Sequence, residues 1–248
     1  MNDSDYEKIG DSSKAATIIR IIVLLLIGAA IIFLIIIGSP KGENYNEIWD
    51  ERTILGSKDA KHHYIMTTDI MCPYCAYFSR ALMSHQEEFE KWLKDNDVVY
   101  EMRITDFLNE YGEAGAKSEQ AAEAVLCATE EDKFWDYYHN TMKSLNEDFH
   151  SKGIGNSKTA PKPEGITADY WVEIGKEVGL GQKFEDCYRN HEQLSHVREN
   201  TAKTAKIMQK KGGSGMPYFQ FGSLETAGFD TSWGWNEVMT YYLEAGLE

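Results

Sequence analysis

Residues 69–75 read Asp-Ile-Met-Cys-Pro-Tyr-Cys, and they place Cys72 and Cys75 three positions apart. The segment before them, residues 61–68 (KHHYIMTT), contains the β-prone run of a short strand. After the cysteines, large side chains recur at spacings of three and four: Phe78, Leu82, His85, Phe89 and Trp92. The pattern predicts a strand, a turn that carries the two cysteines, and a helix from Pro73 to about Lys94.

Cys72 is expected at the start of this helix, where backbone N–H groups have no partner within the helix. Those N–H groups and the helix dipole favour a thiolate over a thiol at this position. Cys75 lies one turn further along, so it can close a small ring with Cys72 or attack a mixed disulfide formed there. Pro73 stiffens the turn. The spacing therefore predicts redox catalysis by Cys72 and Cys75.

Two structural roles for the pair compete with catalysis. One is an inert structural disulfide between Cys72 and Cys75. The other is a zinc site, which needs four ligands. Nearby histidines could complete such a site: His62, His63 and His85. The first two would point to opposite faces of a strand, and the remaining cysteines are isolated in the sequence, so redox catalysis is the favoured interpretation.

The rest of the chain gives the fold class. Residues 97–105 predict a second strand, residues 109–200 read as helical almost throughout, and a strand at 216–221 and a helix at 233–243 follow. Strands on both sides of the helical block must join one sheet, because two strands alone make no stable sheet. We therefore predict an α/β unit formed by residues 60–108 and 201–248, interrupted by an all-helical insertion at residues 109–200.

Several helices are expected within and after this insertion: residues 119–128, 133–145, 168–178, 182–188 and 194–210. Residues 151–165, with three glycines and two prolines, predict a loop. Aromatic side chains at helical spacing are expected in the core rather than on a substrate surface: Phe134, Trp135, Tyr137 and Tyr138.

The chain resembles the DsbA-like thiol-disulfide oxidoreductases, which are thioredoxin folds interrupted by a helical domain. The resemblance spans most of residues 54–243, and four segments carry it: residues 56–60 (GSKDA), 69–75 (DIMCPYC), 133–137 (KFWDY) and 215–219 (GMPYF). It implies that Pro217 is a cis proline beside the active-site cysteines and that the backbone of Met216 pairs with an extended substrate. Pro73 and Tyr74 would then also contact the substrate.

The sequence departs from the family pattern in ways that leave the redox direction open. The family often has an acidic residue six positions before the first cysteine, thought to take the proton of the buried second cysteine, and Met66 stands there instead. Asp69, three positions before Cys72, matches a common family aspartate and is expected to be more exposed. The Pro73-Tyr74 dipeptide also matches glutaredoxins, which act as reductants.

Cys127 and Cys187 both fall within the predicted helical insertion. Some members of the resembling family have a second, structural disulfide there, and this resemblance implies a Cys127–Cys187 bridge. The alternative is two buried free thiols that pack as small apolar groups. Disulfide-compatible cysteines would place the domain outside the cytoplasm.

Residues 21–37 (IIVLLLIGAAIIFLIII) contain nothing more polar than glycine, and with Ile18 and Ile19 the run is long enough to cross a bilayer as a helix. We predict a transmembrane anchor at residues 18–38, a cytoplasmic tail at residues 1–17 and a spacer at residues 39–59. A cleaved signal peptide is the alternative, but its apolar region would be shorter and small residues would mark a cleavage site. The expected location is the cell membrane, with a single span and an extracytoplasmic catalytic domain.

Composition limits the remaining functions. The 248 residues include 25 Lys and Arg against 40 Asp and Glu, for a net charge of −15, which argues against binding to nucleic acid. We therefore predict a membrane-tethered oxidoreductase that introduces disulfides into reduced exported proteins, needs no cofactor and, as the resemblance implies, is re-oxidised by a quinone-linked membrane partner. The alternatives are a reductase or isomerase of misformed disulfides, and an anchored, non-catalytic binding module.

Overall fold

The computed structural model describes residues 47–111, 117–156, 159–211, 213 and 215–247. The predicted tail, transmembrane anchor and most of the predicted spacer lie outside these residues. Among the residues that are described, no helix is both long and apolar enough to span a membrane. The domain described below begins at Ile48.

Five strands form one mixed sheet in the order β1-β3-β2-β4-β5. They are β1 (Ile54–Leu55), β2 (His62–Asp69), β3 (Val98–Thr105), β4 (Tyr218–Phe221) and β5 (Leu224–Ala227). The two central strands, β2 and β3, run parallel in register from His62↔Val98 to Asp69↔Thr105, and the other neighbours are antiparallel. The sheet therefore joins strands from both sides of the helical insertion, as the sequence predicts.

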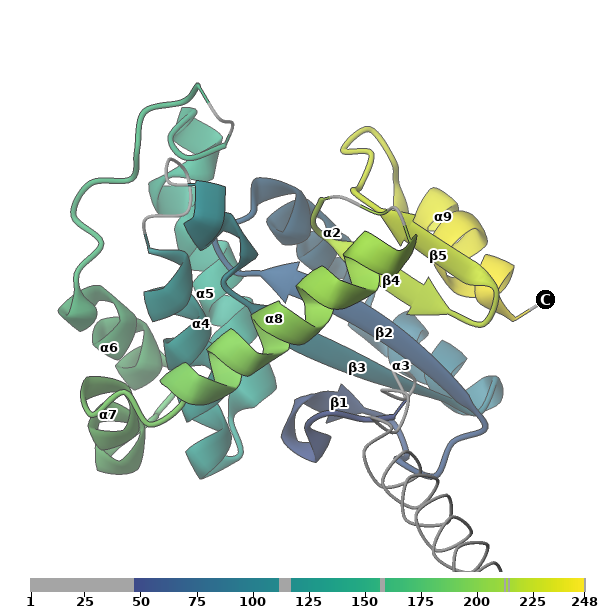
Figure 1. The fold of residues 1–248 in the computed structure, drawn as a ribbon, viewed down its shortest axis with the longest axis horizontal. Coiled ribbons are helices and arrows are strands. Elements are labelled where there is room, and N and C mark those ends of the chain that lie inside the picture. The colour runs from purple at the N-terminus through teal and green to yellow at the C-terminus, as the bar shows by residue number, and fades with distance from the viewer. Residues whose placement is uncertain (1–46, 112–116, 157–158, 212, 214, 248) are drawn as a thin grey trace, which may run out of the picture. The chain divides into compact units, whose positions relative to one another are not determined.

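The helices of the insertion are α4 (Ser118–Cys127), α5 (Phe134–Asp148), α6 (Ala168–Glu177) and α7 (Gln182–Arg189), and the long helix α8 (Leu194–Lys211) leads back to the sheet. Figure 1 shows α8 crossing one face of the sheet, with α2 (Pro73–Ser84) and α3 (Gln86–Asp95) behind it and α4 to α7 gathered to one side. Helices α4 to α8 lie within a few residues of the predicted ranges.

The single helix predicted from Pro73 to Lys94 is wrong, because the chain breaks at His85 into α2 and α3. His85 leaves the helical conformation, with φ −132° and ψ 32°. Its ring nitrogen Nδ1 lies 3.1 Å from the carbonyl oxygen of Ala81, and its ring stacks on Trp235 at 4.8 Å. The apolar spacing continues through this break, so the sequence pattern does not show it.

Two edge strands were not predicted. Residues Ile54 and Leu55, which the sequence assigns to the spacer, pair with β3 as β1. In strand β5 (LETA) the alternation of apolar and polar residues is too weak for the strand to be recognised from the sequence. The strand pairs with β4 through a tight turn at Gly222, where φ is +53°. The predicted closing helix is also shorter: α9 covers Trp235–Val238, and a turn of π-helix follows at Met239–Leu243.

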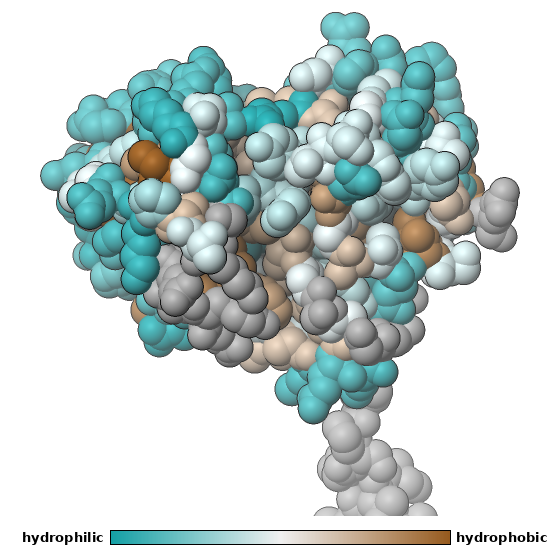
Figure 2. Space-filling view, turned by 90° about the horizontal axis from the view of Figure 1, so that it is seen from above, coloured by the Kyte–Doolittle hydropathy of each residue, from teal (hydrophilic) through white to brown (hydrophobic). Residues whose placement is uncertain are grey.

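Aromatic side chains fill the core between the sheet and its helices. Phe78 of α2 packs against Phe219 of β4 and against Tyr242, with ring centroids 4.7 and 5.7 Å apart. In the insertion, Trp171, Tyr137 and Tyr138 are fully buried, in agreement with the predicted core role of the last two. The outer surface is mostly hydrophilic, with a paler band between two polar sides when the molecule is seen from above (Figure 2).

A buried ionic group lies at the β1 side of the sheet. Glu101 and Arg103 of β3 are both almost completely buried and form an ion pair of 2.9 Å. His63 of β2 lies 3.0 Å from the same Glu101 carboxylate, and the N–H of Trp49 donates to it at 2.6 Å. The Arg103 guanidinium also lies 3.7 Å from the centre of the Trp49 ring. Residues just before β1 are therefore held against the sheet.

Candidate active site

The two cysteines lie where β2 ends and α2 begins. Cys72 occupies the N-cap of α2, and Pro73 takes the first helical position, which its fixed φ suits. The N–H of Cys72 donates to the Asp69 carbonyl at 3.0 Å, and the Cys72 carbonyl accepts from Ala76 N–H at 3.1 Å. The Cys72 side chain itself makes no capping hydrogen bond to the first turn of α2.

A second loop lies beside Cys72. The Met216–Pro217 peptide bond is cis, and it directly precedes β4, whose residue Tyr218 pairs with Thr67 of β2. This pairing brings the loop to the end of β2 that carries the cysteines. The Cys72 thiol donates a hydrogen bond to the Met216 carbonyl oxygen, with 3.6 Å between sulfur and oxygen. The structure thus brings Cys72, Met216 and Pro217 together across 144 residues of sequence.

The site residues differ strongly in exposure. Both active-site thiols are free, Cys72 is 3% exposed and Cys75 is completely buried. Tyr74, between them, is 47% exposed and is one of the few large hydrophobic side chains on the described surface. Only Cys72 and Tyr74 of this turn are therefore placed to meet a molecule that approaches from solvent, although Cys72 does so through a small opening.

Burial raises the pKa of the Cys75 thiol well above its ordinary value, and the neighbouring Cys72 raises it further. The side chain of Thr68 and the backbone of Asp69 act in the opposite direction but do not compensate. Cys75 is therefore held as a neutral thiol next to Cys72, and Cys72, which alone of the two has any exposed surface, is the sulfur that a substrate can reach.

Asp69 is fully buried, so the expectation of a more exposed carboxyl group is wrong. Its carboxyl oxygens accept hydrogen bonds from the N–H of Met71 at 2.9 Å, from the N–H of Leu108 at 2.8 Å and from the Ser118 hydroxyl. Burial nevertheless dominates and raises the pKa of Asp69 to about 6. The bonds to Met71 and Ser118 connect the cysteine turn to the start of α4.

Met66 is buried where the resembling family often has an acid, and its sulfur accepts a hydrogen bond from the Tyr100 hydroxyl at 3.0 Å. Sequence reasoning did not single out three other polar residues near the turn: Thr68, Ser79 and Ser118. Each is buried: Thr68 lies near Cys75, Ser118 donates to Asp69, and Ser79 donates to the Met83 sulfur at 3.7 Å.

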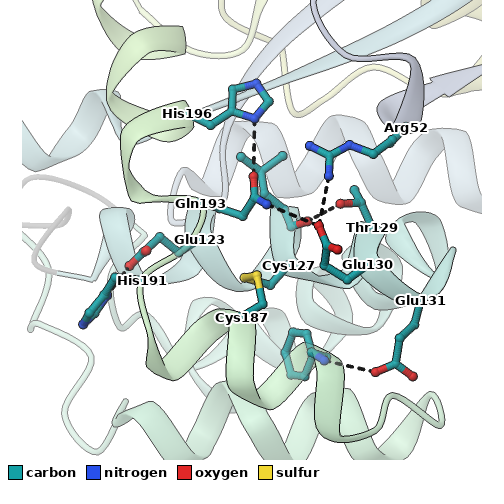
Figure 3. Close-up of a disulfide and its surroundings, with 12 residues drawn as sticks. Arg52, Glu123, Cys127, Thr129, Glu130, Glu131, Cys187, His191, Gln193 and His196 are labelled. Carbon is teal, nitrogen blue, oxygen red and sulfur yellow. Dashed lines mark hydrogen bonds and ion pairs between the residues drawn. A yellow bond between two sulfur atoms is a disulfide. The ribbon is translucent and has the colours of Figure 1, made fainter.

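Cys127 of α4 and Cys187 of α7 form a disulfide bond with an S–S distance of 2.02 Å, the pairing that the family resemblance implies. Figure 3 shows this bond among polar contacts that connect the insertion to the segment before β1. Arg52 forms an ion pair with Glu130 at 3.2 Å, and Glu131 accepts from the N–H of Phe184 at 3.0 Å.

The histidines considered as zinc ligands point to different surroundings. His62 packs edge-on against Phe221, whereas His63 pairs with Glu101. In the part of the chain that the structure describes, no three His, Cys, Asp or Glu side chains are grouped so as to hold a metal ion.

Comparison with known proteins agrees with this architecture. A family model described as Thioredoxin matches residues 50–211. A thioredoxin-like oxidoreductase from Silicibacter pomeroyi has 21% sequence identity and a TM-score of 0.53, over 82% of this chain and 97% of that one. No curated protein matches the chain in sequence.

Two further solved structures share the fold. BdbD from Bacillus subtilis, in its oxidised form, has 18% identity and a TM-score of 0.55, with 79% of this chain and 92% of that chain covered. MdbA, a thiol-disulfide oxidoreductase from Corynebacterium diphtheriae, has 19% identity and a TM-score of 0.53, with 68% and 78% covered. At these identities the likeness establishes the fold.

Proposed function

The chain belongs to the thioredoxin family, and from this premise we propose that it is a thiol-disulfide oxidoreductase that works through Cys72 and Cys75 and introduces disulfides into reduced proteins. One observation carries the proposal: Cys72, at the N-cap of α2, lies 3.6 Å from the Met216 carbonyl next to the cis Pro217. The sulfur of Cys72 and the backbone of the cis-proline loop are thus presented side by side.

In the proposed reaction, the oxidised protein holds a Cys72–Cys75 disulfide. A substrate thiolate attacks the Cys72 sulfur, the Cys72–Cys75 bond breaks, and its electron pair leaves on the Cys75 sulfur, which then takes up a proton. The second substrate thiolate attacks the substrate sulfur of the mixed disulfide, which releases the Cys72 thiolate. Two electrons pass from the substrate to the protein. In this proposal the start of α2 would stabilise the departing Cys72 thiolate, and a well-stabilised leaving group would favour oxidation of the substrate.

Two parts of the surface suit substrate binding. An extended substrate could hydrogen-bond to the backbone at Met216, as an added strand does at the edge of a sheet. The exposed ring of Tyr74 lies next to Cys72 in sequence and would contact residues near the substrate cysteine. Pro73 and Pro217 are buried and would shape the site from beneath.

The setting that we propose is the outer face of a cell membrane. The apolar run at residues 18–38 would tether the domain, exported proteins would be its substrates, and a quinone-linked membrane protein would accept its electrons. The Cys127–Cys187 disulfide supports an oxidising compartment, because such bonds are rare in the cytosol of mesophiles. The acidic composition supports substrates other than nucleic acid.

A trapping experiment tests the catalytic proposal. Cys75→Ala removes the thiol that resolves mixed disulfides, so incubation with a reduced, unfolded secreted protein and a mild oxidant should accumulate an adduct on Cys72 that dithiothreitol releases. The double variant Cys72→Ala/Cys75→Ala is the matched control and should give none. Equal labelling of both variants, or no adduct on either, would reject the proposal.

The opposite redox direction is the second candidate, and it is favoured by the apolar Met66 near the buried cysteine and by the Pro73-Tyr74 dipeptide. The reduction potential of the Cys72–Cys75 pair separates the two directions. A value near about −120 mV is expected for an oxidant, whereas a value near about −270 mV would identify a reductase.

A further inference from the structure

The position of Cys72 relative to Met216 depends on two separate parts of the fold. In the proposed reaction an extended substrate uses both residues, because its sulfur meets Cys72 while its backbone pairs with Met216. The Cys72 sulfur and the Met216 carbonyl oxygen lie 3.6 Å apart, although 144 positions separate the two residues in the sequence. The supports of each residue therefore decide whether one substrate can use both.

The loop that carries Met216 has its own supports. Tyr218, two residues later, pairs with Thr67 of β2. The carbonyl of Pro217 accepts a hydrogen bond from the N–H of Gly228 at 2.7 Å. Both partners lie outside the cysteine turn, which comprises residues 69–75. The loop is thus held by β2 and by the segment after β5.

Asp69 holds the cysteine turn on the other side of the gap. The N–H of Cys72 donates to the backbone carbonyl of Asp69 at 3.0 Å, and the N–H of Met71 donates to its carboxylate oxygen Oδ1 at 2.9 Å. Two bonds to one residue therefore close the chain just before α2. The first bond survives any change of the side chain, whereas the second depends on the carboxylate.

The Asp69 carboxylate is itself held by two segments outside the turn. Its second oxygen, Oδ2, accepts hydrogen bonds from the N–H of Leu108, after β3, at 2.8 Å and from the hydroxyl of Ser118, the first residue of α4. Asp69, Met71 and Ser118 are at most 1% exposed, so bulk water does not compete for these bonds. The carboxylate thus connects the placement of Met71 to the placement of α4.

We propose that Asp69 is a positioning residue, which sets the gap between Cys72 and the Met216 carbonyl and so allows an extended protein substrate to use both. Ser118 acts with it, because its hydroxyl fixes the carboxylate. Both side chains are buried, so they act through the turn and not by touching the substrate. The inference rests on the proposed function, since the gap matters only when substrate sulfur reacts at Cys72.

Small and extended reagents should respond differently when Asp69 is changed. The Cys72 thiolate of the reduced chain attacks a mixed disulfide of thionitrobenzoate, forms a disulfide with the other sulfur of the reagent, and releases thionitrobenzoate as a coloured thiolate. When that other sulfur belongs to cysteamine, the reaction involves Cys72 alone. When it belongs to an extended peptide, the peptide also pairs with the Met216 backbone, so displacement of Cys72 should slow the peptide far more.

The test compares these two reagents. The full-length chain, reduced at Cys72 and Cys75, is mixed with each reagent at pH 7.5, and thionitrobenzoate is followed by its absorbance. At this pH the Asp69 carboxyl group, with a pKa of about 6, is ionised and can accept all three hydrogen bonds. The readout is the rate constant for the peptide divided by that for the cysteamine reagent. Both reagents react at the same sulfur, so a general change in thiol reactivity cancels in this ratio.

Asp69→Asn keeps the size of the side chain but cannot accept all three bonds. We expect the peptide rate constant to fall about tenfold and the cysteamine rate constant to change less than about twofold, since misplacement of a reacting group by 1 Å can cost about a hundredfold in rate. Ser118→Ala keeps the charge of Asp69 and should lower the ratio in the same direction. A purely electrostatic effect of Asp69 on Cys72 would change both rate constants alike.

Asp106→Asn is the matched control. Asp106 directly follows β3, is 7% exposed, and accepts a hydrogen bond from the hydroxyl of Thr201 of α8, so it also connects a strand end to a helix. It should leave the ratio unchanged. The positioning role is overturned if Asp69→Asn and Ser118→Ala keep the wild-type ratio, or if Asp106→Asn lowers it equally. A wild-type chain that releases thionitrobenzoate from neither reagent would overturn the proposed function as well.

Discussion

Asp69, at the end of β2, accepts a hydrogen bond from the hydroxyl of Ser118, at the start of α4. The same carboxyl group holds the N–H of Met71, one residue before Cys72. A single buried side chain therefore connects the helical insertion to the turn that carries the active-site cysteines. This connection explains how an insertion far away in sequence can fix the position of Cys72.

The raised pKa of Asp69 predicts a pH-dependent stability. The folded chain binds this proton more tightly than the unfolded chain, with a pKa of about 6 against an ordinary 3.8. Stability is thus fully present below pH 4 and is lost as the pH rises through 6, by about 3 kcal/mol at about 1.36 kcal/mol per unit. Asp69→Asn should remove this loss. Urea unfolding from pH 4 to 7.5 measures it, and Asp59→Asn, an exposed site, should retain the wild-type slope.

The Cys127–Cys187 disulfide should contribute strongly to stability. It joins positions 60 residues apart, and the chain-entropy relation gives about 4 kcal/mol for a loop of this size. Cys127→Ala/Cys187→Ala should lower the free energy of unfolding by about that amount in urea denaturation. Cys72→Ala/Cys75→Ala, measured against the dithiol form of the wild-type protein, provides the control. Equal stability of the bridged protein and the Cys127→Ala/Cys187→Ala variant would contradict the prediction.

Glu101 should show the opposite dependence on pH. Burial raises its pKa, but His63, Arg103 and the Trp49 N–H outweigh burial, and its pKa lies below the ordinary 4.5. Its stabilising effect is therefore present above pH 4.5 and is lost as the pH falls through the lowered value. Glu101→Gln leaves Arg103 buried without its carboxylate and should cost about 3–5 kcal/mol at pH 7.

Urea unfolding at pH 7 and at pH 3.5 measures this cost, which should shrink at the lower pH. The exposed Glu147 gives a matched control, since Glu147→Gln should change the free energy of unfolding by less than about 0.5 kcal/mol. A Glu101→Gln variant as stable as the wild-type protein would show that the buried pair is dispensable.

The β4–β5 turn predicts that substitution by alanine costs more stability at Gly222 than at Gly153. Gly222 and Gly153 both have positive φ, +53° and +76°, so alanine is strained at either position by about 1–2 kcal/mol. At Gly222 a Cβ would also overlap the carbonyl oxygen of Gly246, whereas nothing lies within 4 Å at Gly153. Gly222→Ala should therefore lower the thermal midpoint clearly more than Gly153→Ala, and equal shifts would contradict this packing.

The sequence predicted the central strands well, because β2 and β3 are long, β-prone and buried. It did not predict β1, which has two residues and depends on pairing with Tyr100 and Glu101 for its existence. It also missed the break at His85. The hydrogen-bond contact between the His85 ring nitrogen and the Ala81 carbonyl does not change the spacing of the apolar residues, so the spacing cannot reveal it. Such elements depend on contacts that no local pattern contains.

The same distinction holds for the site. Cys72 and Cys75 were identified from their spacing, and Met216 and Pro217 from a family resemblance. The burial of Asp69 depends on Ser118, 49 residues away, and was predicted wrongly. Thr68 is a common residue whose position near Cys75 becomes apparent only when β2 and α2 are packed together.

The unequal exposure of the two cysteines also affects their resistance to damage. A peroxide that arrives from solvent meets the sulfur of Cys72 first, because Cys75 is closed off. The sulfenic acid formed there lies next to a thiol, and the two condense to a disulfide with loss of water. Oxidative injury would then return the protein to its disulfide form before irreversible sulfinic acid can accumulate.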